Sequence, residues 1–268
     1  MGIDAGATLC KIACIRDATL VTRSLPTGDL EAARHYIVAC APARIVATGG
    51  GARALEACLE RPIARIDEFT AWLRGAPVLA ADEAVALPAR YLLVSLGTGT
   101  SILLAEGENA RRVGGTALGG GTLMGLGQLL LGSEAFEELA KVALRGDRRR
   151  VDLLVGDIYP QGAPLPPDLN ASSFAKLASR APEDLAHALM GMIGENVGLL
   201  CASFAHTHAV DTVLYCGSTL HANPALRDVL RTLGKRLGLR ALFLERGAFV
   251  GAVGAAVTDD PRSDGPAG

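Results

Sequence analysis

The chain has 268 residues, half of them hydrophobic, and its formal net charge is −2. This length predicts one large domain or two modest ones, and with aromatics at only 4% the core must be built from Ala, Val, Leu and Ile. Because the basic residues are scattered, the sequence predicts no nucleic-acid partner. No apolar run is expected to span a membrane and no secretory signal is visible, so a cytoplasmic location is expected.

Residue types that often bind metals form no pattern of their own. The six cysteines contain no C-x-x-C pair and lie mostly in apolar stretches, so free buried thiols are expected. His206 and His208 have no acidic or cysteine neighbours in the sequence, so a metal site is not expected there. A Walker A motif, a dinucleotide-binding fingerprint and a G-x-S-x-G elbow are also absent from the sequence, so the chemistry must lie in other loops.

Extended stretches and helical patterns follow one another in an order that occurs twice. The first half predicts three strands, then a helix, a strand, a helix and a strand, at 1–5, 11–16, 20–25, 29–39, 44–48, 52–60 and 62–66. The second half predicts strands at 91–96, 102–106 and 110–114, helices at 122–131, 134–144 and 182–206, a strand at 212–216, a further helix, a strand at 240–245 and a helix at 248–257. The long helix carries an apolar stripe of Leu185, Leu189, Met192, Asn196, Leu200 and Phe204.

This repetition predicts a duplicated α/β unit with a cleft between its halves. The expected division is an N-terminal lobe at 1–88 and a C-terminal lobe at 89–258. Ligands of such folds sit where strands end and helices begin. The last ten residues, 259–268, are polar and rich in Pro and Gly, and are predicted to be disordered.

Four loops of small residues follow predicted strands. The first, Asp4 to Thr8 with Lys11 behind it, allows backbone N–H groups to approach a phosphate, with Asp4 near a magnesium ion and Lys11 as a point charge. An ordinary hairpin with an exposed Asp explains the same residues. The second loop, Gly97 to Ser101, offers two glycines and three hydroxyl groups to phosphate oxygens.

The longest of these loops, Gly114 to Thr122, leads straight into a predicted helix. A helix N-terminus preceded by glycines offers unpaired N–H groups to an anion, so the sequence predicts phosphate or nucleotide binding there. The fourth loop, Cys216 to Thr219, suits either a nucleotide base or ribose, or simply a tightly packed helix start. Gly49 to Gly51 complete no dinucleotide-binding fingerprint.

Phosphoryl transfer to an alcohol needs a carboxylate near the attacking hydroxyl and positive charge near the phosphoryl group. Asp67-Glu68 follow a predicted strand at a cleft edge, although acids in the first turn of a helix are favourable for its dipole alone. Asp82 and Glu83 in the next loop are rival acids. Arg111-Arg112 precede the longest glycine loop, where an arginine either holds the substrate or the phosphoryl group by two hydrogen bonds, or is solvated on an edge strand.

Together these segments resemble the type II pantothenate kinases of the actin/hexokinase-like superfamily. The matching stretches, in family order from Gly2 to about Ala256, are GIDAGATLCKI, DEF at 67–69, SLGTGTSILL, RRVGGTALGGGTLMGLGQLL, GDIYP, VLYCGS and LERGAFVGAVGA. The resemblance implies a duplicated ribonuclease-H-like fold that transfers the γ-phosphoryl group of ATP, with Mg²⁺, to the primary hydroxyl of pantothenate, the first step of coenzyme A biosynthesis. It also implies a homodimer with no nucleic-acid or membrane partner, and coenzyme A thioesters as further candidate ligands.

The matched motifs imply roles for single residues. Glu68 matches the catalytic base, Arg112 the contact to the substrate and transition state, and Asp4 the metal ligand. The nucleotide contacts implied by the match are Asp4, Gly6, Ala7, Thr8, Lys11, Thr98, Gly99, Gly120, Gly121, Thr122, Leu123, Met124, Phe136 and Ser218. Ala7 departs from the family, which usually has a second glycine there; its methyl group is tolerated at negative φ and otherwise strains the loop or crowds the phosphate.

Two other functions stay open at this point. A kinase of another small alcohol or of a sugar would use the same nucleotide loops, although sugar kinases usually place a catalytic Asp in the cleft of the second domain. A nucleotide- or acyl-CoA-binding regulator that has lost turnover is suggested by Ala7 alone.

Overall fold

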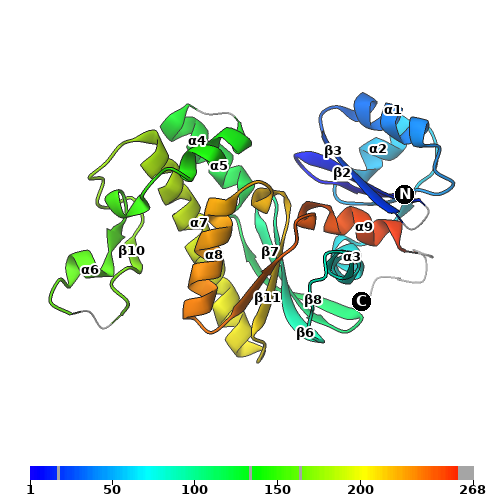
Figure 1. Ribbon diagram of the computed structural model, residues 1–268. Coiled ribbons are helices and arrows are strands. Elements are labelled where there is room, and N and C mark those ends of the chain that lie inside the picture. The colour runs from blue at the N-terminus through cyan, green and yellow to red at the C-terminus, as the bar shows by residue number, and fades with distance from the viewer. Residues whose placement is uncertain (17–18, 133–134, 163–164, 259–268) are drawn as a thin grey trace.

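Each half of the chain builds one five-stranded sheet, and the two sheets share one strand order (Figure 1). The computed structural model describes residues 1–16, 19–132, 135–162 and 165–258, so the predicted tail at 259–268 lies outside the described residues. The first sheet has the order β3-β2-β1-β4-β5, with β1 antiparallel to β2 and parallel to β4. Its strands are β1 (Gly2–Ala5), β2 (Leu9–Arg16), β3 (Thr19–Pro26), β4 (Val46–Thr48) and β5 (Ala64–Arg65).

The second sheet repeats this arrangement as β8-β7-β6-β11-β12, again with two antiparallel and two parallel pairs. Its strands are β6 (Arg90–Leu96), β7 (Thr100–Glu106), β8 (Asn109–Thr116), β11 (Thr212–Cys216) and β12 (Arg240–Phe243). The duplicated α/β fold predicted from the sequence is therefore confirmed.

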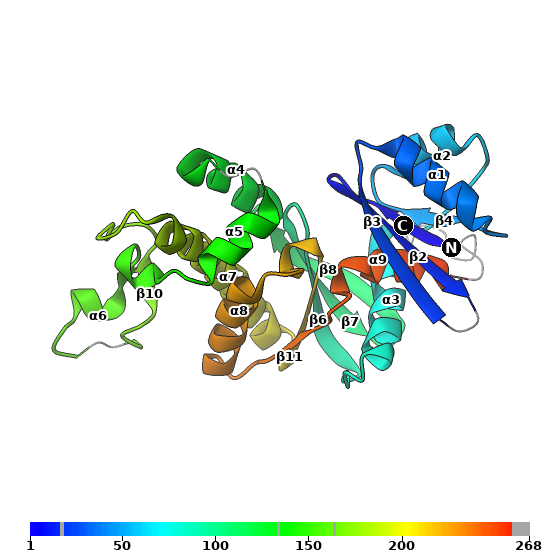
Figure 2. The ribbon, with the colours of Figure 1, turned by 45° about the horizontal axis from the view of Figure 1, so that its top comes forward.

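Helices cover the outer faces of both sheets and fill the space between them (Figures 1 and 2). On the first sheet lie α1 (Leu30–Cys40) and α2 (Ala52–Leu59). Between the sheets lie α3 (Glu68–Asp82) and α9 (Val250–Ala256). The far face of the second sheet carries α4 (Gly120–Leu131), α5 (Phe136–Ala143), α7 (Pro182–Thr207) and α8 (Pro224–Arg236). Asp29 caps α1 as expected, because its side chain accepts a hydrogen bond from the Ala32 N–H at 2.9 Å.

The two helices between the sheets pack with almost no separation. A Cβ atom on Gly254 would lie 1.7 Å from the carbonyl oxygen of Ala71, and one on Gly75 would lie 1.9 Å from that of Val250. α9 also packs on β1, where a Cβ on Gly2 would lie 2.0 Å from the carbonyl oxygen of Ala252. The last described helix, α9, thus packs on the first sheet. The division at 1–88 and 89–258 remains a proposal, and under it α9 belongs to the C-terminal lobe by sequence but packs on the N-terminal lobe.

The long helix α7 runs through the core of the second lobe. Ile193, Val197 and Cys201 are fully buried, whereas Asn196 is exposed and its side chain donates to the Met192 carbonyl at 2.7 Å. The buried stripe is therefore rotated from the predicted one. By length and composition α7 is the one helix in the described part of the chain that could cross a membrane, which corrects the expectation from the sequence, but 61% of its most apolar window is buried inside the molecule.

Between α5 and α7 the chain makes an excursion that the sequence patterns left unassigned. It contains a 3₁₀ turn, η1 (Arg148–Arg150), the strand β9 (Leu153–Leu154), the short helix α6 (Val155–Ile158) and the strand β10 (Asn170–Ser172), which pairs with β9.

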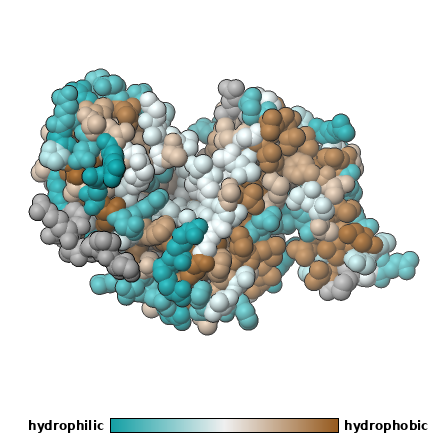
Figure 3. All heavy atoms as spheres, turned by 180° about the vertical axis from the view of Figure 1, so that it is seen from behind, coloured by the Kyte–Doolittle hydropathy of each residue, from teal (hydrophilic) through white to brown (hydrophobic). Residues whose placement is uncertain are grey.

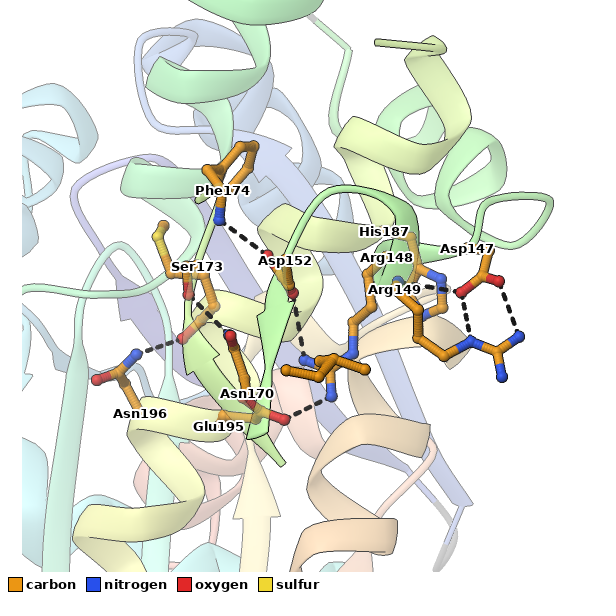
Figure 4. Close-up of polar contacts among 12 residues, drawn as sticks. Asp147, Arg148, Arg149, Asp152, Asn170, Ser173, Phe174, His187, Glu195 and Asn196 are labelled. Carbon is orange, nitrogen blue, oxygen red and sulfur yellow. Dashed lines mark hydrogen bonds and ion pairs between the residues drawn. The ribbon is translucent and has the colours of Figure 1, made fainter. Parts of the chain in front are cut away.

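Buried charges attach this excursion to α7 (Figure 4). Arg148 lies 2.5 Å from the carboxylate of Glu195 and 3.7 Å from that of Asp152, and the Asp152 side chain is fully buried. The other oxygen of Asp152 accepts from the Phe174 N–H at 3.0 Å. Because buried charges are costly unless paired, this cluster specifies where the excursion sits.

Apolar side chains gather on the surface of the second lobe, while the first lobe is mostly hydrophilic (Figure 3). Two leucines of α4, in the second lobe, are exposed: Leu129 is 81% exposed and Leu130 is 46% exposed. Apolar surface of this kind is typical of interaction sites.

Candidate active site

Loops at the ends of strands from both sheets line a cleft of about 900 Å³, which opens into an adjoining hollow of about 670 Å³. The residues that line both are Thr8, Leu9, Lys11, Gly97, Thr98, Ser218 and Ala248. Only the cleft is lined by Asp4, Glu68 and Arg112, and only the hollow by apolar side chains such as Met124 and Phe136. The site therefore has an apolar end, a middle lined by small residues and one cation, and an end that carries acid and base.

Asp4 lies buried at the floor of the cleft, beside Lys11. The two residues are directly opposite each other on β1 and β2, and Lys11 Nζ lies 3.1 Å from Oδ2 of Asp4. Gly49, with a φ of +85°, and Gly251 pass close to this carboxylate, since a Cβ on either would lie 3.0 or 3.1 Å from its oxygens. The alternative of an exposed Asp on a plain hairpin is therefore wrong, because Asp4 is only 5% exposed.

The first loop is held in a tight turn at the edge of the cleft. The Gly6 N–H donates to the Leu9 carbonyl at 3.1 Å, and the Thr27 hydroxyl donates to the Gly6 carbonyl at 2.8 Å. Ala7 is exposed to the cleft, and its φ is not positive. Its methyl group therefore introduces no backbone strain into this loop.

The first and second loops meet across the cleft, where the hydroxyl oxygens of Thr8 and Thr98 lie 3.3 Å apart. Thr8 belongs to the β1–β2 hairpin and Thr98 to the β6–β7 hairpin, so this contact joins equivalent loops of the two sheets. Two facing hairpins of small residues can bring hydroxyl and N–H donors to one phosphate chain.

The third loop packs against the second. This corrects the expectation that the backbone N–H groups at the start of α4 are unpaired. The N–H groups of Gly120 and Gly121 donate to the carbonyls of Gly97 and Thr98 at 2.8 and 2.9 Å, so they are not available to an anion. A Cβ on Gly119 would lie 2.7 Å from the Thr98 carbonyl oxygen. The glycines of this loop are thus required mainly for close packing, although Gly120 and Gly121 still line the hollow.

The fourth loop leads from the end of β11 into the 3₁₀ turn η2 (Ser218–Leu220) and packs against the turn η3 (Gly247–Phe249). Gly217, with a φ of +107°, donates from its N–H to the Gly247 carbonyl at 3.1 Å. A Cβ on Gly217 would lie 2.2 Å from the Leu96 carbonyl oxygen, so the prediction of a tightly packed loop is confirmed. Ser218 also lines the cleft and the hollow, and its contact to a nucleotide stays a prediction.

Glu68 is the first residue of α3 and lines the cleft. Asp67 caps the helix by accepting from the N–H groups of Phe69 and Thr70 at 2.9 and 3.0 Å, which leaves Glu68 free of that task. The Glu68 side chain is open to the solvent of the cleft, but the surrounding walls raise its pKa by desolvation, and the charge of Asp4 raises it further. Lys11 acts in the opposite direction. A carboxylate with a raised pKa in a cleft is suited to accept a proton.

The rival acids Asp82 and Glu83 lie at the opposite end of α3. Arg246 forms ion pairs with both, and neither lines the cleft or the hollow. Arg112 lines the cleft from β8, next to a bulge in which Val113 is the extra residue. Bulges re-aim side chains near active sites, and Arg112 forms no ion pair with any residue that the structure describes. Arg111 instead contacts His208 at 3.4 Å.

The structure brings nearly all the residues expected from the sequence to one cavity. The exceptions are Thr122, whose hydroxyl donates to the Ala117 carbonyl at 3.0 Å, and Leu123, which is fully buried in the core of the second lobe. Leu123 therefore cannot offer its side chain to a nucleotide.

Sequence reasoning assigned no site role to several other residues that line the cavity. They are Gly49, Gly50, Gly51, Trp72, His221, Gly247, Ala248 and Phe249. The three consecutive glycines after the strand at 44–48 were a visible signal, but their role depends on how β4 sits beside β1.

Two sheets of this duplicated order, with hairpin loops from both facing one cleft, define the class of actin/hexokinase-like ATPases. Solved structures with the same fold include the activator of the 2-hydroxyisocaproyl-CoA dehydratase from Clostridium difficile with bound ADPNP, at a TM-score of 0.63 and 14% identity over 95% of this chain and 91% of that one. A ROK family glucokinase from Streptomyces griseus, in complex with glucose and AMPPNP, has a TM-score of 0.56 and 15% identity over 95% of this chain and 97% of that one.

The family model described as Fumble matches residues 15–258. The type II pantothenate kinase of Staphylococcus aureus strain USA300 is 32% identical over 261 residues, which cover 95% of this chain and 97% of that protein. The chain therefore belongs to the Fumble family, the family of the type II pantothenate kinases, and is a kinase.

Proposed function

We propose that this kinase transfers the γ-phosphoryl group of ATP to the primary hydroxyl of pantothenate and so forms 4'-phosphopantothenate for coenzyme A biosynthesis. The observation that carries the proposal is the position of Glu68. This carboxylate has a raised pKa and lines the cleft but not the adjoining apolar hollow. The staphylococcal relative, named for this substrate, supports the choice of pantothenate.

We infer that each part of the reactants occupies a different part of the cavity. The apolar hollow with Met124 and Phe136 takes the adenine and ribose, and the shared middle with Thr8, Lys11 and Thr98 takes the phosphate chain. The end with Glu68 and Arg112 takes the alcohol. This order places the terminal phosphate next to the acid and the acceptor.

In the reaction the acceptor oxygen forms a bond to the γ-phosphorus while the bond from that phosphorus to the β,γ-bridging oxygen breaks. The Glu68 carboxylate accepts the proton of the hydroxyl, and ADP keeps the electron pair of the broken bond. Lys11 and Arg112 stabilise the negative charge on the phosphoryl oxygens, Lys11 as a point charge and Arg112 through paired N–H donors.

The residues present fit a magnesium ion held mainly by its substrate. No cluster of three or more acidic, histidine or cysteine side chains among the described residues forms a complete metal cage. Mg²⁺ in kinases is usually bound by one or two carboxylates together with phosphate oxygens, and Asp4, buried in the cleft beside Lys11, supplies one. When bound, Mg²⁺ neutralises charge on the phosphates.

The proposal is tested by incubating the protein with ATP, Mg²⁺ and pantothenate, and identifying the product by ³¹P NMR and mass spectrometry. Glucose and pantetheine serve as alternative acceptors. Phosphorylation of glucose but not pantothenate would favour the sugar-kinase alternative. A folded preparation that turns over no acceptor would contradict the proposal.

The alternative of a regulator without turnover was suggested by Ala7 alone. Because the φ of Ala7 is not positive, this residue no longer supports that alternative. A homodimer and coenzyme A thioesters as additional ligands remain predictions from the family resemblance, and a cytoplasmic location remains a prediction from the sequence. The exposed leucines of α4 support an association of copies.

A further inference from the structure

Glu83 accepts hydrogen bonds from the backbone just before the cleft-lining turn η3 of the second lobe. It follows α3, at the end of that helix opposite Glu68. One carboxylate oxygen accepts from the Glu245 N–H at 2.7 Å, and the other accepts from the Arg246 N–H at 2.9 Å. The side chain is only 13% exposed. Hydrogen bonds from backbone N–H groups to a charged, largely buried carboxylate are among the stronger ones in proteins, so this contact fixes the backbone at 245–246.

The backbone fixed in this way leads directly into the nucleotide end of the cavity. Arg246 is followed by the turn η3, in which Ala248 lines the shared middle and Phe249 lines the apolar hollow. The hydrogen bond from Gly217 to Gly247 passes the constraint on to the turn that carries Ser218.

Helix α3 begins with the candidate base, Glu68, and is followed directly by Glu83. α3 packs on α9 with backbone contact at Gly75 and Gly254, and α9 starts immediately after η3. Glu68, α3, α9 and η3 are therefore joined by close packing and by the continuity of the chain, and Glu83 links the far end of α3 to the residues just before η3.

We propose that Glu83 is a positioning residue, which holds the turns at 217–218 and 247–249 in the arrangement that binds the nucleotide. It touches no reactant and acts through the backbone of Glu245 and Arg246. The inference rests on the proposed function in taking ATP as the nucleotide and pantothenate as the acceptor.

The test compares Glu83→Gln with a matched control, Asp82→Asn. Glutamine keeps the size of the side chain, but it loses the charge and turns an NH₂ group toward one of the two backbone N–H donors. Asp82→Asn removes the neighbouring ion pair to Arg246 and leaves both backbone hydrogen bonds in place. Calorimetric titration with AMPPNP and Mg²⁺ should show affinity about 10-fold weaker for Glu83→Gln, and within about twofold of wild type for Asp82→Asn.

Steady-state kinetics should show the same split. The KM for ATP should rise about 10-fold in Glu83→Gln, while kcat and the KM for pantothenate change by less than about twofold. Glu83→Gln that is folded by circular dichroism and binds AMPPNP as tightly as Asp82→Asn would overturn the proposal.

Glu83→Asp covers the case in which the glutamine variant does not fold. It keeps the charge but shortens the reach to the two N–H groups, so it must weaken AMPPNP binding without changing the KM for pantothenate, and an unchanged affinity would again overturn the proposal. Because analogue binding is measured without turnover, a wild-type protein that binds AMPPNP but does not phosphorylate pantothenate would contradict the proposed function alone.

Discussion

The ammonium group of Lys11 lies 3.1 Å from a carboxylate oxygen of Asp4, and both side chains are largely buried in the cleft. The pair does more than satisfy a buried acid. Asp4 raises the pKa of Glu68 and Lys11 lowers it, so the charges that would bind the metal and the phosphates also tune the candidate base.

The pKa of Glu68 should therefore respond in opposite directions to two substitutions. Asp4→Asn should lower it and Lys11→Met should raise it, each relative to a wild-type value above the ordinary range of a glutamate. A ¹³C NMR titration of the Glu68 carboxyl measures this directly, with Asp82→Asn as a control that leaves the titration unchanged. Shifts in the same direction for both variants would contradict the assigned electrostatics.

The raised pKa also fixes the sign of the pH dependence of catalysis. A base must be ionised to accept a proton, so kcat/KM should fall as the pH drops through the raised pKa of Glu68, at a higher pH than an ordinary glutamate would give. The acid limb of the kcat/KM profile checks this, provided that the protein remains folded over the same range.

Glu68→Gln should abolish phosphoryl transfer while AMPPNP still binds, because the amide cannot accept the proton but fills the same space. The expected loss in kcat is about 10²-fold or more. Asp67→Asn is the matched control, since asparagine also caps helices and should leave transfer largely intact. Near-normal turnover by Glu68→Gln would remove this residue from its role.

The contact between α3 and α9 predicts a large effect of a single methyl group. Gly254→Ala should destabilise the protein by about 1–3 kcal/mol or more, because the new Cβ would overlap the Ala71 carbonyl. Gly125→Ala, in a helix position with open space around it, should instead leave stability unchanged or raise it by up to about 1 kcal/mol. Urea denaturation distinguishes the two, and equal stabilities would show that α3 and α9 are less closely packed.

The buried cluster around Arg148 predicts a second stability effect. Arg148→Met should cost about 3–5 kcal/mol at neutral pH, because it leaves the carboxylates of Asp152 and Glu195 buried without their cation. Arg149→Ala removes an exposed pair with Asp147 and should leave the stability nearly unchanged, because solvent screens such a pair.

This effect should depend on pH with a defined sign. Burial raises the pKa of Asp152, so the folded state binds this proton more tightly than the unfolded state, and stability falls as the pH rises through the raised value. Arg148 lowers that pKa, so its removal should steepen the fall. The denaturant midpoints of wild type and Arg148→Met should therefore approach each other as the pH is lowered. A difference between the two midpoints that grows toward acid pH would contradict this prediction.

The sequence by itself determined the repeated order of elements, the hairpin with Asp4 and Lys11, and the candidate base and arginine. These signals are local: the alternation of apolar residues, the position of small residues in turns and the acids at the start of α3 depend on near neighbours in the chain. The family motifs added the order of the loops and selected Glu68 and Arg112 among the candidate residues.

Only the tertiary structure decided which glycines line the cavity and which pack against neighbouring backbone. Gly119 to Gly121 look like an anion site in the sequence, yet their surroundings include the carbonyls of Gly97 and Thr98, about 20 residues earlier in the chain, which take up two of the amides. The return of α9 to the first sheet, and the clamp of Glu83 on Glu245 and Arg246, likewise join segments far apart in the chain. Contacts of this kind leave no periodic pattern, because they depend on which surfaces meet once both sheets have formed.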